Sequence, residues 1–299
     1  MPVVIELFNG FRFVAYPDCY VSSGLLYTRI PDYNEITFLR KHVDGGTLVD
    51  VGANVGSISL LLADKIDHAF MFEPNPIAAA RARDNITINS LRFEVHEAAL
   101  SDSVGEVELE DRGGVDSSNR TIVGKIKTSF PTRTVPRITL DSFLEKKAAK
   151  FPAIKAVKID VEGHENSVLR GMLGCLKTAR PRLVMFEYLQ RTSIVETLAI
   201  FESVDYCVFR LLRNRPLLVD KSVEPLQNLF ACPKELLSSL GIETRNSERA
   251  ISLRESEGLR ERTPGPGGRR TVVEGLTPTH QAQRLSRVYR ECLELAAES

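Results

Sequence analysis

Residues 48–59 read L-V-D-V-G-A-N-V-G-S-I-S, and this stretch decides the fold. The apolar run at 47–51 predicts a buried strand, the residues after it predict a turn, and the apolar spacing that follows predicts a helix. This layout brings backbone N–H groups and the positive end of a helix to one point. Gly52 and Gly56 permit a positive φ or a close backbone approach to a ligand, and Asn54 tolerates the same left-handed region. The alternative is an ordinary turn whose glycines serve packing.

The spacing of this turn separates two kinds of nucleoside site. Asp50 precedes the turn, so the pattern is D-x-G-x-N-x-G and not the G-x-G-x-x-G of dinucleotide-binding turns. It is similar to the turn of S-adenosylmethionine-dependent methyltransferases, in which an acid before the turn faces the amino end of the cofactor.

A second motif supports a nucleoside site at this turn. An apolar run at 68–72 ends in Glu73, which lies 21 residues after Gly52. At that distance the next parallel strand ends after one crossover, and an acid there hydrogen-bonds ribose hydroxyls. Pro76 suits the first turn of a following helix, with Asn75 as its N-cap.

The residues before the first landmark predict a side wall and not a separate domain. Apolar β-formers on both sides of Asn9-Gly10 predict a β-hairpin. Asp32-x-x-Glu35 predicts a capping box that opens a helix to about Lys41.

From residue 47 onward, strands and helices alternate, which predicts a parallel sheet with helices on both faces. Strands are expected at 47–51, 68–73, 92–98, 154–159 and 182–188, with edge candidates at 207–212, 217–220 and 228–232. Helices are expected at 56–65, 76–88, 165–177 and 192–203, and 112–131 is expected to be a mobile loop. Ligands in such sheets bind beyond the carboxyl ends of the strands. Gly52, Glu73, Ser101 and Asp160 each follow the end of an expected strand, so they are expected to converge.

Composition limits the partners. The 299 residues include 39 basic and 39 acidic ones, and this balance argues against a nucleic-acid binder that works through bulk charge. The five scattered cysteines show no C-x-x-C spacing, which indicates free thiols in a reducing compartment and no zinc site. No run approaches a membrane span and the first residues do not resemble a signal peptide, so a cytoplasmic protein is expected.

The composition changes beyond about residue 243. Residues 244–275 are rich in charge, Gly and Pro and predict a disordered linker, and 276–299 predict a C-terminal helix. That helix is expected to dock on the domain; the alternative is a contact with a partner. The expected organisation is therefore a hairpin and cap at 1–46, a main domain at 47–243, the linker and the helix.

Six pieces of this chain together resemble the FkbM family of S-adenosylmethionine-dependent methyltransferases. They are D-V-G-A-N-V-G-S-I-S (50–59), F-E-P-N-P (72–76), A-A-L-S-D (98–102), K-I-D-V-E-G-H-E (158–165), L-R-G-M (169–172) and P-R-L-V-M-F-E (181–187). They occur in family order, and the resemblance covers about 35–233. It implies an α/β fold, the Rossmann-like seven-stranded class I methyltransferase sheet. It also implies methyl transfer, mostly to hydroxyl oxygen, on acceptors that include sugars and macrolide-type products.

The resemblance gives the first set of residues a role toward S-adenosylmethionine. We expect Gly52, Asn54 and Gly56 to approach the cofactor closely, and Glu73 to take its ribose hydroxyls. Asp50 is expected to orient the turn or to meet the methionine ammonium. Ser101 or Asp102 is expected near the adenine.

A second set is assigned to the reaction. Asp160 and Glu162 lie two residues apart, so in extended geometry both point the same way, toward the sulfonium or the acceptor hydroxyl. The alternative for Glu162 is a carboxylate that stabilises the next helix N-terminus. His164 is expected to accept the hydroxyl proton, or else to be an exposed histidine in a first helical turn. Glu187 is either a site wall or a buried, paired acid. No metal is expected, because no ligand cluster is visible in the sequence.

With these residues, the resemblance implies an O-methyltransferase for a hydroxyl on a carbohydrate or a polyketide-type product. An NAD-dependent oxidoreductase is disfavoured by the missing glycine triplet. A nucleic-acid methyltransferase is disfavoured because the stretch after the fourth strand lacks an Asn or Asp followed by Pro-Pro and an aromatic residue. A cofactor-binding partner protein without catalysis is the third alternative.

Overall fold

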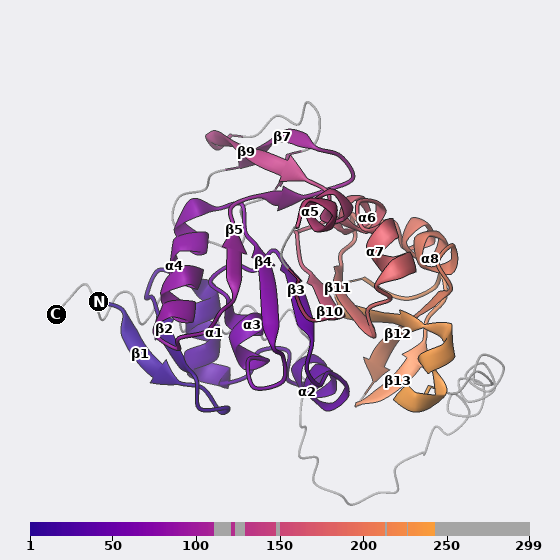
Figure 1. The fold of residues 1–299 in the computed structure, drawn as a ribbon, viewed down its shortest axis with the longest axis horizontal. Coiled ribbons are helices and arrows are strands. Elements are labelled where there is room, and N and C mark those ends of the chain that lie inside the picture. The colour runs from indigo at the N-terminus through magenta and orange to yellow at the C-terminus, as the bar shows by residue number, and fades with distance from the viewer. Residues whose placement is uncertain (111–120, 123–128, 148–149, 213, 226, 243–299) are drawn as a thin grey trace, which may run out of the picture. The chain divides into compact units, whose positions relative to one another are not determined.

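The computed structural model describes residues 1–110, 121–122, 129–147, 150–212, 214–225 and 227–242 (Figure 1). Its central feature is an eight-stranded sheet in the order β13-β12-β14-β11-β10-β3-β4-β5. The strands are β3 (Thr47–Val51), β4 (His68–Phe72), β5 (Glu94–His96), β10 (Ile154–Ile159), β11 (Leu183–Tyr188), β12 (Tyr206–Leu212), β13 (Arg215–Leu218) and β14 (Gln227–Pro233). The five neighbouring strands β11, β10, β3, β4 and β5 pair in parallel. Strand β14 pairs antiparallel with β11 and β12. The predicted Rossmann-like α/β class is confirmed.

The sheet has one strand more than the seven implied by the resemblance. The additional strand is β13, which pairs antiparallel with β12 from Leu212↔Arg215 to Phe209↔Leu218. The edge strand expected at 217–220 therefore begins two residues earlier, because β12 returns directly through a hairpin.

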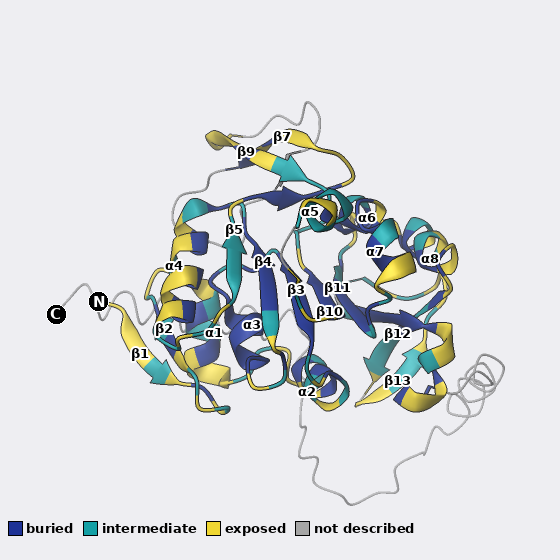
Figure 2. Ribbon diagram, in the orientation of Figure 1, coloured by how far each residue is buried: buried dark blue, intermediate teal, exposed yellow. Residues whose placement is uncertain are grey.

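Helices cover both faces of the sheet (Figure 1). One group is α1 (Tyr20–Thr28), α2 (Tyr33–His42), α3 (Ser57–Leu61) and α4 (Pro76–Thr87), and the other is α5 (Leu140–Lys146), α6 (Glu165–Arg170), α7 (Leu173–Thr178) and α8 (Ile194–Glu202). Strand side chains alternate between two cores. Leu48 and Met71 pack with the first group, whereas Val49 and Phe70 pack with the second. The central strands are consequently buried along most of their length (Figure 2).

The first 46 residues form the expected hairpin, the expected helix α2 and one helix that the sequence did not predict. β1 (Val3–Glu6) and β2 (Arg12–Ala15) pair antiparallel, with Gly10 at a φ of 83°. The unpredicted helix is α1. The capping box was wrong: Asp32 has a φ of 46° and its side chain makes no cap hydrogen bond to α2. A left-handed residue turns its carboxylate away from the N–H groups that a capping residue would reach.

A small second sheet follows β5. It has the order β6-β9-β7-β8, with β6 (Ala99–Leu100), β7 (Gly105–Glu110), β8 (Thr121–Ile122) and β9 (Thr132–Ile138). In this sheet β7 pairs antiparallel with both β9 and β8. Most of the loop expected at 112–131 lies outside the described residues.

Two helices differ in extent from those expected. The helix expected at 56–65 ends at Leu61, and the one expected at 165–177 breaks into α6 and α7 at Gly171-Met172. A Cβ on Gly171 would lie 1.8 Å from the carbonyl oxygen of Ser101, so this glycine permits close packing at the break. Other described elements are two 3-10 turns, Lys234–Leu236 and Ser238–Leu240.

The linker and the C-terminal helix expected at 244–299 lie outside the described residues. Among described residues, no helix is long and apolar enough to cross a membrane. Cys19, Cys175, Cys207 and Cys232 are free thiols.

Candidate functional site

The candidate site lies where the strand order reverses. From β3 the chain moves outward through β4 to β5, and it then returns to place β10 and β11 on the other side of β3. A crevice beyond the carboxyl ends of the strands is expected at such a switch point. Gly52 follows β3, Glu73 follows β4 and Asp160 follows β10, so the fold brings three predicted residues to this edge.

The turn after β3 has the backbone that the sequence predicted. Gly52, Asn54 and Gly56 have φ values of 72°, 51° and 83°. A Cβ on Gly52 would lie 1.9 Å from the carbonyl oxygen of Asp160, and one on Gly56 would lie 2.8 Å from the Met71 side chain. Both glycines therefore serve packing within the protein, in addition to the turn geometry.

Glu73 joins the end of β4 to this turn. Its Oε2 accepts a hydrogen bond from the backbone N–H of Asn54 at 2.8 Å, and its Oε1 accepts one from Asn75 at 2.8 Å. The residue is 8% exposed, and burial raises the pKa of its carboxyl to about 7. Asn54 Oδ1 is buried and has no hydrogen-bond partner among the described residues. An acid at the rim of the turn and an acceptor without a donor thus lie together.

Asp50 is enclosed beneath the turn. It is 0% exposed, its Oδ2 accepts a hydrogen bond from Ser59 Oγ at 2.7 Å, and its Oδ1 lies 3.4 Å from Lys158 Nζ. Of the two roles expected for Asp50, these contacts suit orientation of the turn, since the side chain does not reach the surface.

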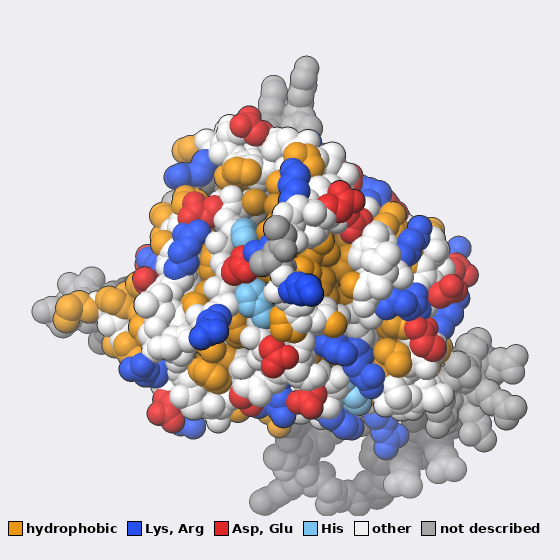
Figure 3. Space-filling view, viewed as in Figure 1, with side chains coloured by type: hydrophobic (Ala, Val, Ile, Leu, Met, Phe, Trp, Pro, Cys, Tyr) orange, Lys and Arg blue, Asp and Glu red, His pale blue; other side chains and the backbone are white. Residues whose placement is uncertain are grey.

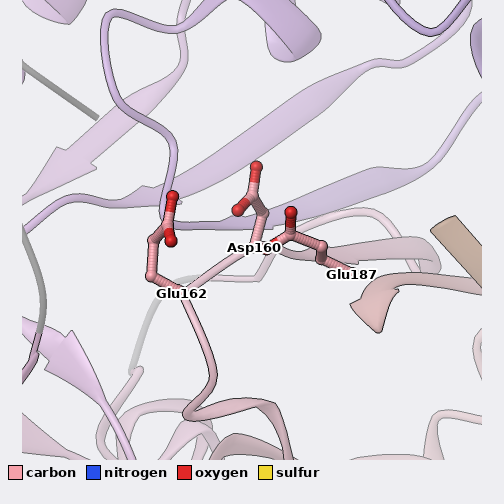
Figure 4. Close-up of side chains that lie close together, drawn as sticks. All are labelled: Asp160, Glu162 and Glu187. Atoms are coloured by element: carbon pink, nitrogen blue, oxygen red, sulfur yellow. The ribbon is translucent and has the colours of Figure 1, made fainter. Parts of the chain in front are cut away.

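Three carboxylates gather beside the turn (Figure 4). Asp160 and Glu162 come from the loop after β10 and Glu187 comes from β11, and one oxygen of each lies within 4.8 Å of the others. Two cations adjoin them: Lys158 Nζ lies 3.6 Å from Asp160 Oδ2, and Arg191 Nη2 lies 2.9 Å from Glu162 Oε2. Such a cluster can stabilise a positive charge that enters it.

The three carboxylates differ in their surroundings. Burial, with the nearby charges of Asp160 and Glu162, raises the pKa of Glu187 to about 8, and Glu187 Oε2 is buried without a hydrogen-bond partner among the described residues. Glu162 has a φ of 57°, a conformation that costs a non-glycine residue energy and that is frequent at functional sites. The expectation that no metal is needed stays a prediction.

His164 lies in a different group from Asp160 and Glu162. Its Nε2 is 2.9 Å from Ser101 Oγ, and Ser101 Oγ is 3.3 Å from Asp102 Oδ1. Arg170 holds Asp102 through an ion pair of 3.0 Å. Burial lowers the pKa of His164, so its imidazole favours the neutral form. The fold therefore brings His164 to the residues expected near the adenine, and not to the carboxylates.

Sequence reasoning missed two structural supports of the 160–163 loop. Glu165 is 0% exposed and accepts hydrogen bonds from the backbone N–H groups of Val161 and Gly163, at 3.3 and 2.9 Å. A Cβ on Gly163 would lie 2.0 Å from Arg191 Nε, so this glycine lets Arg191 cross the loop. Glu165 thus bonds the N–H groups on either side of Glu162, whose own carboxylate pairs with Arg191.

Surface charge agrees with the neutral composition. On the face shown in Figure 3, acidic and basic side chains of the described residues are interspersed.

Comparison with known proteins identifies the domain. The model of the methyltransferase FkbM domain matches residues 50–211, more than half of the chain. The hexuronic acid methyltransferase AglP of Haloferax volcanii is 32% identical over 145 residues, which are 47% of this chain and 55% of AglP. The match thus spans about half the length of that curated relative.

A crystal structure of methyltransferase FkbM from Methylobacillus flagellatus matches with a TM-score of 0.42 and 18% identity, over 72% of this chain and 47% of that one. An S-adenosylmethionine-dependent O-methyltransferase of Thermotoga maritima matches with a TM-score of 0.39 and 14% identity, over 77% of each chain. With the domain match at 50–211, which contains the turn, Glu73 and the three carboxylates, this chain belongs to the FkbM methyltransferase family.

Proposed function

We propose that this protein is an S-adenosylmethionine-dependent O-methyltransferase that acts on a hydroxyl group of a carbohydrate or a polyketide-type natural product. The observation that carries the proposal is the hydrogen bond from the Asn54 N–H to Glu73. It places the acid that follows β4 against the glycine-containing turn that follows β3, at the switch point of the sheet.

The residues at this edge fit the cofactor. Glu73 has lone pairs beyond its two backbone hydrogen bonds, so it can accept from ribose hydroxyls. The free Asn54 Oδ1 can accept a further donor from a ligand. We assign Gly52 and Gly56 to the backbone approach, Asp50 to the orientation of the turn, and Ser101 with Asp102 to the adenine side. When bound, the cofactor supplies a methyl group activated by a sulfonium.

The carboxylate cluster supplies the remaining chemistry. We assign Asp160 and Glu162 to electrostatic support of positive charge at the reacting centre. Methylation of a hydroxyl releases one proton, and Glu187 is the group best matched to accept it. Its raised pKa lies near working pH, as a general base requires. His164, which we expected in that role, is engaged with Ser101, and we now assign it to the adenine side.

A carbohydrate acceptor is supported by the relative. AglP is named as a hexuronic acid methyltransferase, and its match to this chain spans 145 residues. Acceptor choice would depend on residues 1–46, which precede the main domain in sequence, on the segment 111–135 within that domain, and on the end of the sheet.

The cofactor assignment predicts a selective binding result. Calorimetry on the purified protein is expected to show binding of S-adenosylhomocysteine and none of NAD. Glu73→Ala should weaken S-adenosylhomocysteine binding by about tenfold or more, because hydrogen bonds to a charged group contribute about 1.5–3 kcal/mol. Glu97→Ala is the matched control, since Glu97 is exposed and pairs with Arg83 on the surface. Binding of NAD alone would overturn the methyltransferase proposal, and binding without methyl transfer to any acceptor would favour the non-catalytic alternative.

Glu73 also predicts a pH dependence. Ribose hydroxyls donate to the ionised carboxylate, but the free protein protonates Glu73 below its raised pKa of about 7. Lowering the pH from 8 to 6 should therefore weaken S-adenosylhomocysteine binding by about tenfold. Glu73→Gln cannot ionise, so its weaker affinity should change little over this range. An equal pH dependence in both proteins would assign the titration to another group.

A further inference from the structure

A buried lysine lies between the turn and the carboxylates. Lys158 is in β10, directly beside Asp50 of β3 in the parallel register. It is 4% exposed. Alternation along β10 places Lys158 on the same face of the sheet as Ala156, which packs in the core with α1 to α4. An ammonium at such a position has to be paired, because an isolated buried charge is costly.

Lys158 contacts backbone carbonyl groups as well as the acids that neutralise its charge. Nζ donates a hydrogen bond to the carbonyl oxygen of Gly52 at 2.7 Å, and the carbonyl oxygen of Val51 lies at 3.5 Å. The same nitrogen lies 3.4 Å from Asp50 Oδ1 and 3.6 Å from Asp160 Oδ2. One ammonium therefore contacts the start of the turn, its buried acid and the first carboxylate after β10.

Electrostatics keep this lysine charged. Burial alone would lower the pKa of Lys158, but the charges of Asp50 and Asp160 together raise it. The two acids differ in exposure: Asp50 is enclosed, whereas the Asp160 side chain is 47% exposed and reaches the site. Asp160 also faces repulsion from the neighbouring carboxylates Glu162 and Glu187. Lys158 is the buried cation that opposes this repulsion.

The backbone alone does not fix the Asp160 carboxylate. The N–H of Asp160 donates to the carbonyl oxygen of Val51 at 3.0 Å, which sets the main chain beside the turn. Among the described residues, the Asp160 side chain forms its ion pair with Lys158. Without it, a half-exposed side chain beside two like charges would turn toward solvent, where its charge is screened.

We infer that Lys158 is a positioning residue that holds the Asp160 carboxylate and the Gly52 carbonyl in one arrangement, and so couples the cofactor turn to the reacting centre. This inference rests on the proposed function, since it concerns the same site. The competing explanation is that Lys158 only neutralises buried Asp50.

Removing the charge of Asp50 separates the two explanations. In an Asp50→Asn background, Lys158 loses the buried acid with which it forms an ion pair, while Asn can keep the hydrogen bond with Ser59. Four proteins are compared by calorimetric titration with S-adenosylmethionine: Asp50→Asn alone, with Lys158→Met, with Asp160→Asn, and with both. Thermal unfolding of each shows that the titrated protein is folded, and Lys158→Gln is the second variant if Lys158→Met unfolds. Lys155→Met, at the exposed position of the same strand, is the matched control.

The inference predicts a non-additive result. Lys158→Met and Asp160→Asn should each weaken S-adenosylmethionine binding by about tenfold relative to Asp50→Asn, and the combination should be no more than about twice weaker than the worse of the two. Unchanged or tighter binding after Lys158→Met would show that Lys158 is only a counter-ion. Losses that multiply to about 100-fold would show that Lys158 acts independently of Asp160. A wild-type protein that does not bind S-adenosylmethionine contradicts the proposed function itself, and this is seen before any variants are compared.

Discussion

Gly52→Ala is expected to abolish measurable S-adenosylhomocysteine binding and to lower the melting temperature by about 10 °C. Gly52 has a φ of 72°, and an alanine in that region costs about 1–2 kcal/mol. The larger cost is steric, because the new Cβ would lie 1.9 Å from the carbonyl oxygen of Asp160 and 2.9 Å from its carbonyl carbon. Both are backbone atoms, so no side-chain rotation relieves the clash. The turn and the end of β10 have to separate, which moves the cofactor turn away from Asp160.

Gly241→Ala is the matched control for this experiment. Gly241 has the same φ of 72°, but a Cβ there would meet no atom within 4 Å. The control therefore carries the backbone strain without the collision, and it should lower the melting temperature by only a few degrees and leave binding unchanged. Calorimetry and a thermal melt on both proteins test the idea. Equal effects of the two substitutions would show that strain, and not the contact with Asp160, explains the requirement for glycine.

The parts of the site that lie close together in sequence were predictable. The spacing of Gly52, Asn54 and Gly56 predicted left-handed backbone, and the structure confirms it. Glu73 was predictable because one strand and one helix have a nearly fixed length, so that the distance from Gly52 indicates the end of the next strand. These arguments depend on local backbone geometry and on one crossover, which a single sequence expresses directly.

Contacts between distant strands were not predictable in the same way. Lys158 looked like one residue of a buried strand, and its role depends on which strand lies beside β10. Glu187 was left open for the same reason, since its neighbours Asp160 and Glu162 come from the loop after a different strand. The break at Gly171 depends on the Ser101 carbonyl. Asp32 shows the converse, because its local pattern fitted a capping box and the fold gave it a different backbone conformation.

Glu187→Gln is expected to reduce kcat for methyl transfer by about 100-fold or more, the usual contribution of a general base. The charged groups that act on Glu187 are Asp160 and Glu162 in the loop after β10, Glu165 in α6 and Lys158 in β10. The acids outnumber the lysine, and burial adds to their effect, so the pKa of Glu187 is raised to about 8. A carboxyl with that pKa is largely protonated at pH 7 and ionised at pH 9. The wild-type kcat should therefore rise by about tenfold over this range, because only the ionised form accepts a proton.

The measurement is a pH–rate profile for transfer of a labelled methyl group to an acceptor found by screening hexuronic acids and neutral glycosides. In Glu187→Gln the rise toward pH 9 should disappear while S-adenosylhomocysteine affinity stays within about threefold of wild type, since a proton acceptor acts on the chemical step. Glu202→Gln, an exposed position on α8, is the matched control.

His164→Asn distinguishes the rival base. If His164 accepts the proton, its loss should remove the pH dependence and Glu187→Gln should retain it. The structure argues for the opposite result, because His164 Nε2 already lies 2.9 Å from Ser101 Oγ whereas Glu187 Oε2 is buried among like charges without a hydrogen-bond partner in the described part of the chain. A carboxylate in that position gains most from taking up a proton, since protonation relieves both its burial and its repulsion. The buried Lys158 would then offset the negative charge of this cluster while Glu187 changes its charge with each methyl transferred.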